Sequence, residues 1–215
     1  MPAPQTLLFD LDGTIIDSIQ LIVDSYHHTL RVHGHPPRTD AEWLAGIGTP
    51  LRVQFQEWSS DPTTLEAMIA TYREFNLARH DEHVRPYPGV VERILEIRAY
   101  GVPTGLVTSK NRNGALRGLG LCHPESLMDV LVCADDVVHP KPHPEPVEKA
   151  VSLLGADPAT TVYIGDSVHD MRSGRAAGVK TAAVLWGPFT REELSATEPD
   201  YWLEKPEDLT SLLNR

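Results

Sequence analysis

The feature that most constrains the fold is a short apolar run near the N-terminus that stops abruptly at two carboxylates. Residues 7–9 are Leu-Leu-Phe, and Asp10, Asp12 and Gly13 follow them. Such a run is typical of a buried strand whose last residues emerge at the carboxyl edge of a parallel sheet. Asp10 and Asp12 then project to the same side, and Gly13 permits a sharp turn with free N–H groups. The pattern suits metal-assisted phosphoryl transfer, although a lone acidic turn also follows many ordinary strands.

Length and charge limit the classes of protein to which the chain can belong. Its 215 residues can bury one sizeable core and carry a smaller second lobe. The formal net charge of −11 argues against a nucleic-acid or anionic-membrane partner, since phosphate groups require clustered Lys and Arg. No stretch approaches the ~20 apolar residues of a membrane-spanning helix, and no leader pattern is visible. We therefore expect a cytoplasmic protein with neither membrane nor nucleic acid as partner, and the sequence leaves monomer and dimer open.

Residues 16–85 show helical periodicity and no strand pattern. Asp17 or Ser18 can cap a first helix, and Asp61 with the proline after it opens the last one. Pro and Gly residues at 86–89 then mark a return linker. This segment is therefore expected to be a small helical domain inserted between two parts of another domain.

From residue 86 onward, amphipathic helices alternate with short apolar runs. This alternation indicates a parallel sheet with helices on both faces. The expected strands are residues 103–107, 128–133, 161–164 and 179–185, with an edge strand at 201–203, and the expected helices are 90–98, 143–154 and 168–177. The predicted fold class is α/β, with a parallel core over 1–15 and 86–215 and the helical insertion over 16–85.

Polar residues follow several of the expected strands and should meet at one edge of the sheet. Thr108 and Ser109 follow residues 103–107, Asp166 follows a later strand, and Lys141 lies just beyond another. Ligands bind outside the carboxyl ends of the strands in an open parallel sheet. Each residue also has an ordinary alternative role, as a strand-end hydrogen bonder, a helix cap or a solvated amine. Their joint occurrence favours a site.

Phosphoryl chemistry assigns a role to each of these residues. Asp10 can attack phosphorus to form an aspartyl-phosphate, while Asp12, kept protonated by crowding and burial, exchanges a proton with the leaving oxygen and then with water. Oxygen ligands around a hard cation indicate Mg²⁺, with Asp10 and Asp166 as ligands and the main-chain carbonyl of Asp12 as a plausible third. Lys141 supplies the counter-charge, and Thr108 with neighbouring amides holds the transferring oxygens.

Asp170 lies four residues beyond Asp166 and is expected on the same face of the helix that begins there. From that face it can orient Lys141 or a water on the metal. The alternative is a plain surface acid. Asp170 is therefore a supporting candidate, as are Gly13 and Ser167, which flank the main acids.

These clusters resemble, in the family's order, the four motifs of the haloacid dehalogenase (HAD) superfamily. The matching segments are residues 10–14, Thr108-Ser109, Lys141-Pro142, and residues 165–167 with Asp170, and the likeness covers nearly the whole chain. The resemblance implies a Rossmann-like core with a mobile helical cap. It also implies that Asp10 is the nucleophile and Asp12 the acid/base, with Mg²⁺ held by Asp10, the Asp12 main chain and Asp166.

Within the superfamily, the second acid at position 12 favours phosphohydrolases over dehalogenases. The chain looks like the phosphoglycolate phosphatase group. Segments at 71–76, 80–82, 135–139 and 144–147 also resemble the PpaX-type inorganic pyrophosphatases. His143 departs from that likeness, because an acidic residue is expected there.

Specificity is expected to come from the cap, because the core contacts only the phosphoryl group of a small-molecule phosphate. Gly46 and Gly48 in a cap loop, with Arg52 beside it, can present amides and a guanidinium to a second anionic group, and Arg73 can do the same from the last cap helix. Both arginines can instead lie on solvated helix faces. A carboxylate and a second phosphate suit these groups equally, so phosphoglycolate and pyrophosphate both remain open.

Two other functions fit the same residues. A phosphomutase of the same superfamily would return the phosphate to a sugar. A phospho-accepting switch would use aspartate phosphorylation to bias a conformation without turnover, but such a switch needs no lid of this size.

Overall fold

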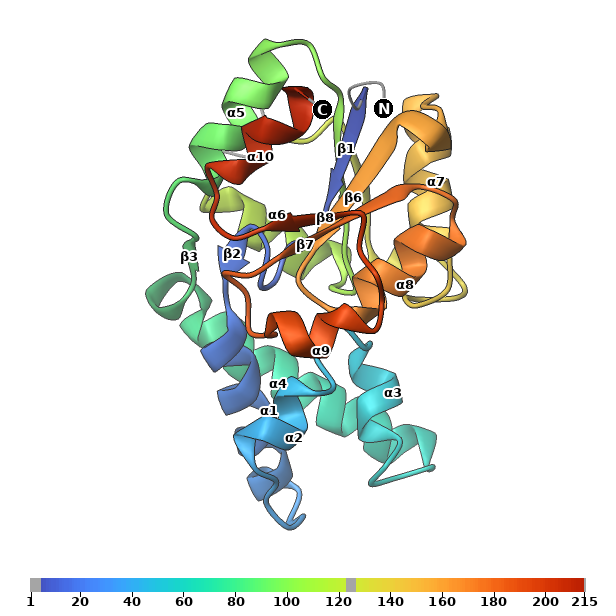
Figure 1. Cartoon of the computed structure of the whole chain (residues 1–215). Coiled ribbons are helices and arrows are strands. Elements are labelled where there is room, and N and C mark those ends of the chain that lie inside the picture. The colour runs from blue at the N-terminus through green and yellow to red at the C-terminus, as the bar shows by residue number, and fades with distance from the viewer. Residues whose placement is uncertain (1–4, 123–126, 215) are drawn as a thin grey trace.

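The computed structural model describes residues 5–122 and 127–214, and its centre is a six-stranded parallel sheet (Figure 1). The strand order is β5-β4-β1-β6-β7-β8. The order reverses direction on either side of β1, so the carboxyl end of β1 is the switch point where α/β proteins bind ligands. The strands are β1 (Thr6–Phe9), β4 (Thr104–Val107), β5 (Val130–Val132), β6 (Thr161–Gly165), β7 (Lys180–Val184) and β8 (Tyr201–Leu203). The predicted α/β class and Rossmann-like core are confirmed.

The three central strands are buried on both faces. Every residue of β1, β4 and β6 is buried, which explains why these strands appear in the sequence as continuous apolar runs. Within β1, Leu7 and Phe9 pack into the core on one face of the sheet, while Leu8 packs with Val147 and Tyr163 on the other. The alternation of side chains along a strand thus gives the sheet a core on each side.

Helices cover both faces of the sheet. Helix α7 packs against β4 and β5, and α8 packs against β6 and β7, while α5 and α10 contact each other. The helices and short 3-10 turns of this part are α5 (Val90–Ala99), α6 (Arg112–Gly120), η2 (Ala134–Asp136), α7 (Glu145–Leu154), η3 (Pro158–Thr160), α8 (Val168–Ala176), α9 (Arg191–Ser195), α10 (Asp208–Ser211) and η4 (Leu212–Asn214). None of the helices in the described ranges is both long and apolar enough to cross a bilayer.

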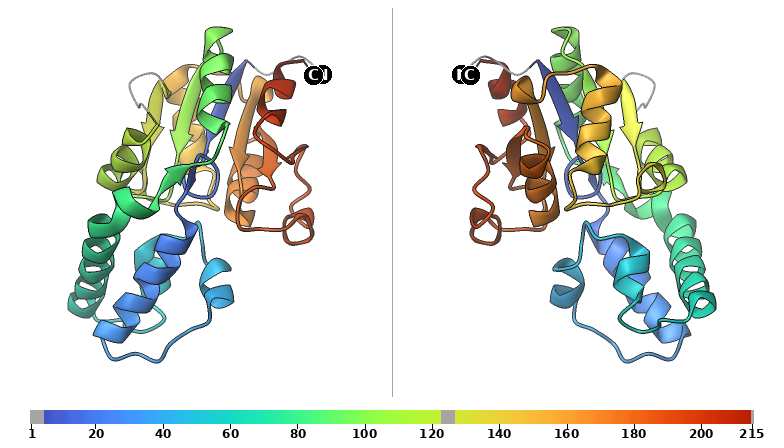
Figure 2. Two further views of the ribbon diagram at one scale, coloured as in Figure 1. Left: turned by 90° about the vertical axis from the view of Figure 1, so that its left-hand side faces the viewer. Right: turned by 90° about the vertical axis from the view of Figure 1, so that its right-hand side faces the viewer.

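The remaining helices form a separate group below the carboxyl edge of the sheet (Figure 2). They are α1 (Ile19–Val32), α2 (Asp40–Leu44), α3 (Leu51–Phe55) and α4 (Pro62–His83). Their own hydrophobic cluster includes Tyr26, Trp43, Phe55 and Tyr72, and the rings of Tyr26 and Trp43 stack at 4.2 Å. A core of their own lets these helices keep their arrangement without burial against the sheet.

The helix starts in this group lie where the capping signals place them. Ser18 occupies the N-cap of α1, and Asp61 accepts a hydrogen bond from the Thr64 N–H at the start of α4. The hydroxyl of Ser18 makes no capping bond, however, because it donates to Asp12 instead. A helix start is therefore tied directly to the acidic turn after β1.

The structure differs from the sequence expectation at both ends of the inserted segment. The expectation of no strand over residues 16–85 is wrong there, because β2 (Ile16–Asp17) pairs antiparallel with β3 (Arg85–Pro86). Two-residue strands are too short to produce a periodic pattern. Helix α6 was also not expected, because three of its residues are glycines and weaken the helical signal.

Candidate active site

Side chains that are far apart in the sequence meet beyond the carboxyl end of β1. The Lys141 Nζ donates to Oδ1 of Asp10 at 2.9 Å and to Oδ1 of Asp170 at 2.6 Å. The Thr14 hydroxyl donates to Oδ1 of Asp166 at 3.0 Å. All five residues are buried. The structure thus gathers three carboxylates and one ammonium group at the switch point of the sheet.

The register of the two central strands places Asp10 and Asp166 next to each other. Phe9 lies opposite Ile164 in the parallel pair, and the Asp10 N–H donates to the Ile164 carbonyl at 2.9 Å. Asp166 follows directly after β6. Gly13 adopts a φ of +85°, and a Cβ at this position would lie 2.5 Å from Oδ2 of Asp166. The turn therefore requires glycine both for its backbone conformation and for space.

Lys141 is enclosed by acceptors. Besides the two carboxylates, its Nζ lies 3.1 Å from the Tyr163 hydroxyl and 3.5 Å from the Val107 carbonyl. Burial alone would lower the pKa of Lys141, but Asp10 and Asp170 outweigh burial and raise it above its usual value. The lysine is therefore a fixed positive charge beneath the carboxylate of Asp10.

Asp170 is fully buried, so the surface-acid alternative is wrong. Its Oδ2 accepts from the N–H and hydroxyl of Ser167 in a capping box at the start of α8. Its Oδ1 accepts from Lys141 and from the Tyr163 hydroxyl at 2.8 Å. Burial would raise the pKa of Asp170, but the bonds to Lys141, Ser167 and Tyr163 lower it.

Tyr163 is a site residue that the sequence analysis missed. It lies within the buried strand β6, and its hydroxyl also bonds to the Val107 carbonyl at 3.0 Å. The only signal in the sequence is a polar-tipped ring inside an apolar run that ends two residues later at the Gly165-Asp166 pair. A buried tyrosine hydroxyl usually has a partner, and here Lys141 and Asp170 are partners in addition to the Val107 carbonyl.

The site is short of positive charge on the side of Asp166. Burial raises the pKa of Asp10 to about 7 despite the opposing effect of Lys141. Burial, reinforced by Asp170 and Asp10, raises the pKa of Asp166 well above its usual value. Oδ2 of Asp166 is buried without a hydrogen-bond partner in the described part of the chain.

These donors fit a hard divalent cation. Asp10, Asp166 and Asp170 each offer a carboxylate oxygen, and these oxygens lie within 4.8 Å of one another. An orphaned carboxylate oxygen beside two further acids is the ligand chemistry that Mg²⁺ favours. The arrangement can therefore accept a divalent cation at the place where charge is missing.

The protonation state expected for Asp12 is wrong in this structure. Its Oδ1 accepts from Lys110 Nζ at 2.6 Å and from the Ser18 hydroxyl at 2.5 Å. Burial would raise the pKa of Asp12, but Lys110 and Ser18 lower it below its usual value. Asp12 is therefore a carboxylate. Lys110 was missed, although it directly follows the Thr108-Ser109 pair that the sequence singled out.

Thr108 and Ser109 lie at the end of β4 and face the same pocket as the acids. The Thr108 hydroxyl accepts from the Lys110 N–H at 3.2 Å. The Ser109 hydroxyl donates to the Gly48 carbonyl at 2.6 Å, so this residue also joins the sheet domain to the helical group. A second contact is made by Thr49, whose hydroxyl lies 3.3 Å from Nε2 of His169.

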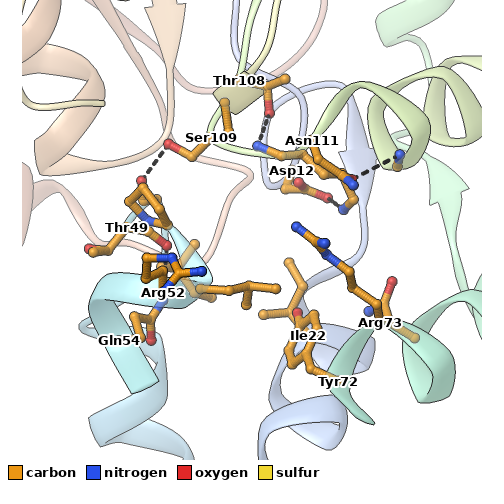
Figure 3. A pocket seen from close by; sticks show the side chains of 18 of the residues that line it. Asp12, Ile22, Thr49, Arg52, Gln54, Tyr72, Arg73, Thr108, Ser109 and Asn111 are labelled. Carbon is orange, nitrogen blue, oxygen red and sulfur yellow. Dashed lines mark hydrogen bonds and ion pairs between the residues drawn. The ribbon is translucent and has the colours of Figure 1, made fainter. Parts of the chain in front are cut away.

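A cavity of about 620 Å³ separates the acids from the helical group. Figure 3 shows its two walls, with Asp12, Thr108 and Ser109 above and Arg52, Tyr72 and Arg73 below. Of the cap candidates, Gly48, Arg52 and Arg73 line the cavity. Gly46 does not line it, because it packs against Gln54, whose Nε2 donates to the Gly46 carbonyl at 2.9 Å.

The fold and this acidic cluster define a class of hydrolases, and the comparisons with known proteins agree. Residues 7–184 match the model of the haloacid dehalogenase-like hydrolases, and the chain belongs to this family. It is 44% identical to the pyrophosphatase PpaX of Anoxybacillus flavithermus over 209 residues, which are 97% of this chain and 96% of the relative. It is 42% identical to the PpaX of Bacillus mycoides over 98% of this chain and 97% of the relative. The chain is thus a hydrolase of the phosphatase class.

Solved structures show the same architecture. A Bacteroides fragilis protein, described provisionally as a haloacid dehalogenase-like hydrolase, has a TM-score of 0.87 and 28% identity, with 94% of this chain and 97% of that one covered. A Lactobacillus plantarum protein, described provisionally as a phosphoglycolate phosphatase, has a TM-score of 0.85 and 25% identity, with 99% and 100% covered. The resemblance seen in the sequence, both to the superfamily and to the PpaX-type group, is confirmed.

Proposed function

We propose that this enzyme is a Mg²⁺-dependent phosphohydrolase that forms an aspartyl-phosphate on Asp10 and acts on a small anionic phosphate. The observation that carries the proposal is that Lys141 bonds to both Asp10 and Asp170, while the nearby Asp166 keeps an unpartnered Oδ2. The PpaX relatives support pyrophosphate as the first substrate to test. The Lactobacillus plantarum structure supports phosphoglycolate as the second.

The metal ligands in this proposal are Asp10, Asp166 and the main-chain carbonyl of Asp12. Oδ2 of Asp166 supplies the unpartnered oxygen, and Asp170 supports the site through Lys141. Bound Mg²⁺ supplies charge neutralisation, which lets an anionic nucleophile approach an anionic phosphate.

The residues of the chain perform the two half-reactions. Lys141 fixes Oδ1 of Asp10, and an Asp10 oxygen attacks phosphorus while the bond to the leaving oxygen breaks. Thr108, Ser109 and nearby amides hold the transferring oxygens. Asp12, a carboxylate held by Lys110, then takes a proton from a water whose oxygen bonds to phosphorus while the bond from phosphorus to Asp10 breaks. Asp12 passes that proton to solvent as phosphate leaves.

In the same proposal, residues 16–85 act as a cap over the core made by residues 1–15 and 86–215. The separate hydrophobic cluster of α1 to α4 supports this division, as does the docking of Gly48 on Ser109. A docked cap excludes water from the reacting groups until the leaving group departs.

The test is phosphate release from pyrophosphate, phosphoglycolate, hexose phosphates and p-nitrophenyl phosphate, with Mg²⁺ and with a chelator. We expect the first two substrates to be preferred, chelation to abolish turnover, and Asp10→Asn to lower kcat by about 10³-fold or more. Asp24→Asn, at an exposed acid on α1, is the matched control. Wild-type rates in Asp10→Asn would overturn the proposal. Phosphate migration on a hexose without net release would instead identify a mutase, and a stable acyl phosphate without turnover would identify a switch.

A further inference from the structure

The cationic side chains that line the cavity differ in whether an acid already neutralises them. Lys141 and Lys110 are each held by carboxylates of the site. Arg52 forms an ion pair with Glu66. Arg73 also lines the cavity, yet it has no hydrogen bond, ion pair or ring contact with any residue in the ranges 5–122 and 127–214. Among these cations, Arg73 alone has its charge available for a ligand.

The position of Arg73 places that charge on the side of the leaving group. Arg73 belongs to the face of α4 that also brings Tyr72 to the cavity. In Figure 3 its side chain rises from α4 toward Asp12 and Asn111, whereas Arg52 lies beside Gln54 and Thr49. A phosphoryl group on Asp10 would therefore have its substituent projecting into the space that the Arg73 guanidinium borders.

The two cap arginines are thus not equivalent. The carboxylate of Glu66 accepts from Nη2 of Arg52 and would repel a second anion there. Arg73 keeps a planar set of donors that matches the oxygens of a carboxylate or a phosphate. Arg73 is exposed, so with a neutral leaving group its donors would bond to water and add nothing to substrate binding.

We infer that Arg73 is the specificity-determining residue for the leaving group, and that the enzyme selects phosphate compounds whose leaving group carries its own negative charge. The inference rests on the proposed function and deepens it. The class includes a diphosphate, in which Arg73 binds the second phosphate, and a phosphorylated hydroxy acid, in which it binds the carboxylate. Simple monoesters of neutral alcohols or phenols fall outside it.

The kinetic test compares Arg73→Met with the wild type on three substrates. With pyrophosphate or phosphoglycolate, kcat/KM should fall about 10- to 100-fold, the range for losing a hydrogen bond to a charged group. With p-nitrophenyl phosphate, whose leaving group lacks a second anion, the change should stay below about threefold. Arg73→Lys should recover part of the loss. Of pyrophosphate and phosphoglycolate, the substrate whose kcat/KM falls more in Arg73→Met is the one whose leaving group Arg73 binds more strongly.

Two matched variants serve as controls. Arg79→Met alters another arginine of α4, whose guanidinium stacks on Phe75 outside the cavity. Arg79→Met should leave the ratio of kcat/KM between pyrophosphate and p-nitrophenyl phosphate within about threefold of the wild-type ratio. Arg52→Met removes the paired arginine and should change this ratio less than Arg73→Met does. An equal loss on all substrates in Arg73→Met, or no loss on any, would overturn the inference.

A binding measurement separates this inference from the proposed function. Methylenediphosphonate carries two anionic groups and methylphosphonate carries one, and neither is hydrolysed. By calorimetry with Mg²⁺, the wild type should bind the diphosphonate about tenfold tighter or more, and Arg73→Met should lose that preference. If the wild type released no phosphate from any substrate, the proposed function would be wrong. The preference for the diphosphonate would still test the role of Arg73, because binding does not require turnover. The inference would be wrong if the wild type showed no preference for the diphosphonate, or if Arg73→Met kept that preference.

Discussion

The Lys141 Nζ lies 2.9 Å from Oδ1 of Asp10, although 131 positions separate the two residues along the chain. Both side chains are buried, and the same ammonium also reaches Asp170 and the Tyr163 hydroxyl. One lysine therefore bonds to a candidate nucleophile and to a supporting acid at the same time. A protein interior tolerates such a group only when its charge is matched and its donors are bonded.

Removal of Lys141 should cost both stability and activity. Lys141→Met would leave the buried carboxylates of Asp10 and Asp170 without their cation. Unfolding in urea should then require about 3–5 kcal/mol less free energy, and turnover should be lost. Lys205→Met, at an exposed lysine, is the control and should unfold like the wild type.

A double-mutant cycle separates the ion pair from general damage to the core. Lys141→Met leaves two buried carboxylates without a cation, and Asp170→Asn removes one of them. The double variant should therefore lose less free energy of unfolding than the two single variants lose together. Additive losses would show that Lys141 and Asp170 do not interact in the way that their 2.6 Å contact indicates.

Magnesium should stabilise the protein through the unpartnered oxygen of Asp166. A ligand that binds only the folded state at 100 times its Kd adds about 2.7 kcal/mol, which corresponds to a rise in Tm of about 5–10 °C for a chain of this size. Thermal melts with Mg²⁺ and with EDTA measure this rise. Asp166→Asn should lose most of it, while Asp24→Asn should keep it. An equal rise in both variants would place the cation elsewhere.

The ion pair between Asp81 and Arg117 should make stability depend on pH under acidic conditions. Both guanidinium contacts are 2.9 Å long and join α4 to α6. Together with the hydrogen bond between His80 and Asp81, they lower the pKa of Asp81 to about 2 from its usual 3.8. Because the folded pKa is lowered, the contribution is present above about pH 4 and is lost as the pH falls toward 2.

Asp81→Asn tests this dependence. The Tm difference between the wild type and Asp81→Asn should shrink as the pH falls from 5 to 3, because protonation removes the same charge that the substitution removes. The exposed position of Asp81 limits the effect to a small shift. A difference that grows on acidification would have the wrong sign for this ion pair.

Gly48 should be needed for docking of the cap loop, whereas Gly34 should not. Gly48 has a φ of +92°, and an added Cβ would lie 3.2 Å from Oγ of Ser167 and 3.3 Å from Cδ2 of His169. Gly34 has a φ of +70°, but an added Cβ would meet no described atom within 4 Å. Both Gly→Ala variants carry backbone strain, so both should lose about 1 kcal/mol or more of stability.

Only Gly48→Ala should change substrate binding. Displacement of the loop would break the hydrogen bond from Ser109 to the Gly48 carbonyl, and KM should rise several-fold. Gly34→Ala provides the matched control, because it has the same kind of strain away from the site. Equal KM values for the two variants would show that the loop contact has no part in substrate binding.

The core of the site was predictable because the signals are local and one topological rule joins them. Each of Asp10, Thr108 and Asp166 directly follows an apolar run, and parallel strands bring their carboxyl ends to one edge. The capping signal at Asp61 likewise acts within a few residues. Such short-range patterns can be recognised without knowledge of contacts between distant residues.

The predictions that failed concern residues whose interaction partners lie far away in the sequence. The charge of Asp12 is set by Lys110, 98 positions later, and no local pattern reports that contact. Burial and crowding alone predicted a protonated acid, and the lysine reverses that result. The difference between Arg52 and Arg73 has the same origin, since it depends on which acid the neighbouring helix presents.

The pairing of Asp17 with Arg85 has a consequence for how such enzymes diversify. The chain leaves the sheet domain and returns to it at adjacent points, so the residues between them form an inserted segment whose two ends lie side by side. Recombination can replace the inserted segment by one of another length without shifting the catalytic strands. New leaving-group preferences can therefore arise while the reaction itself is inherited unchanged.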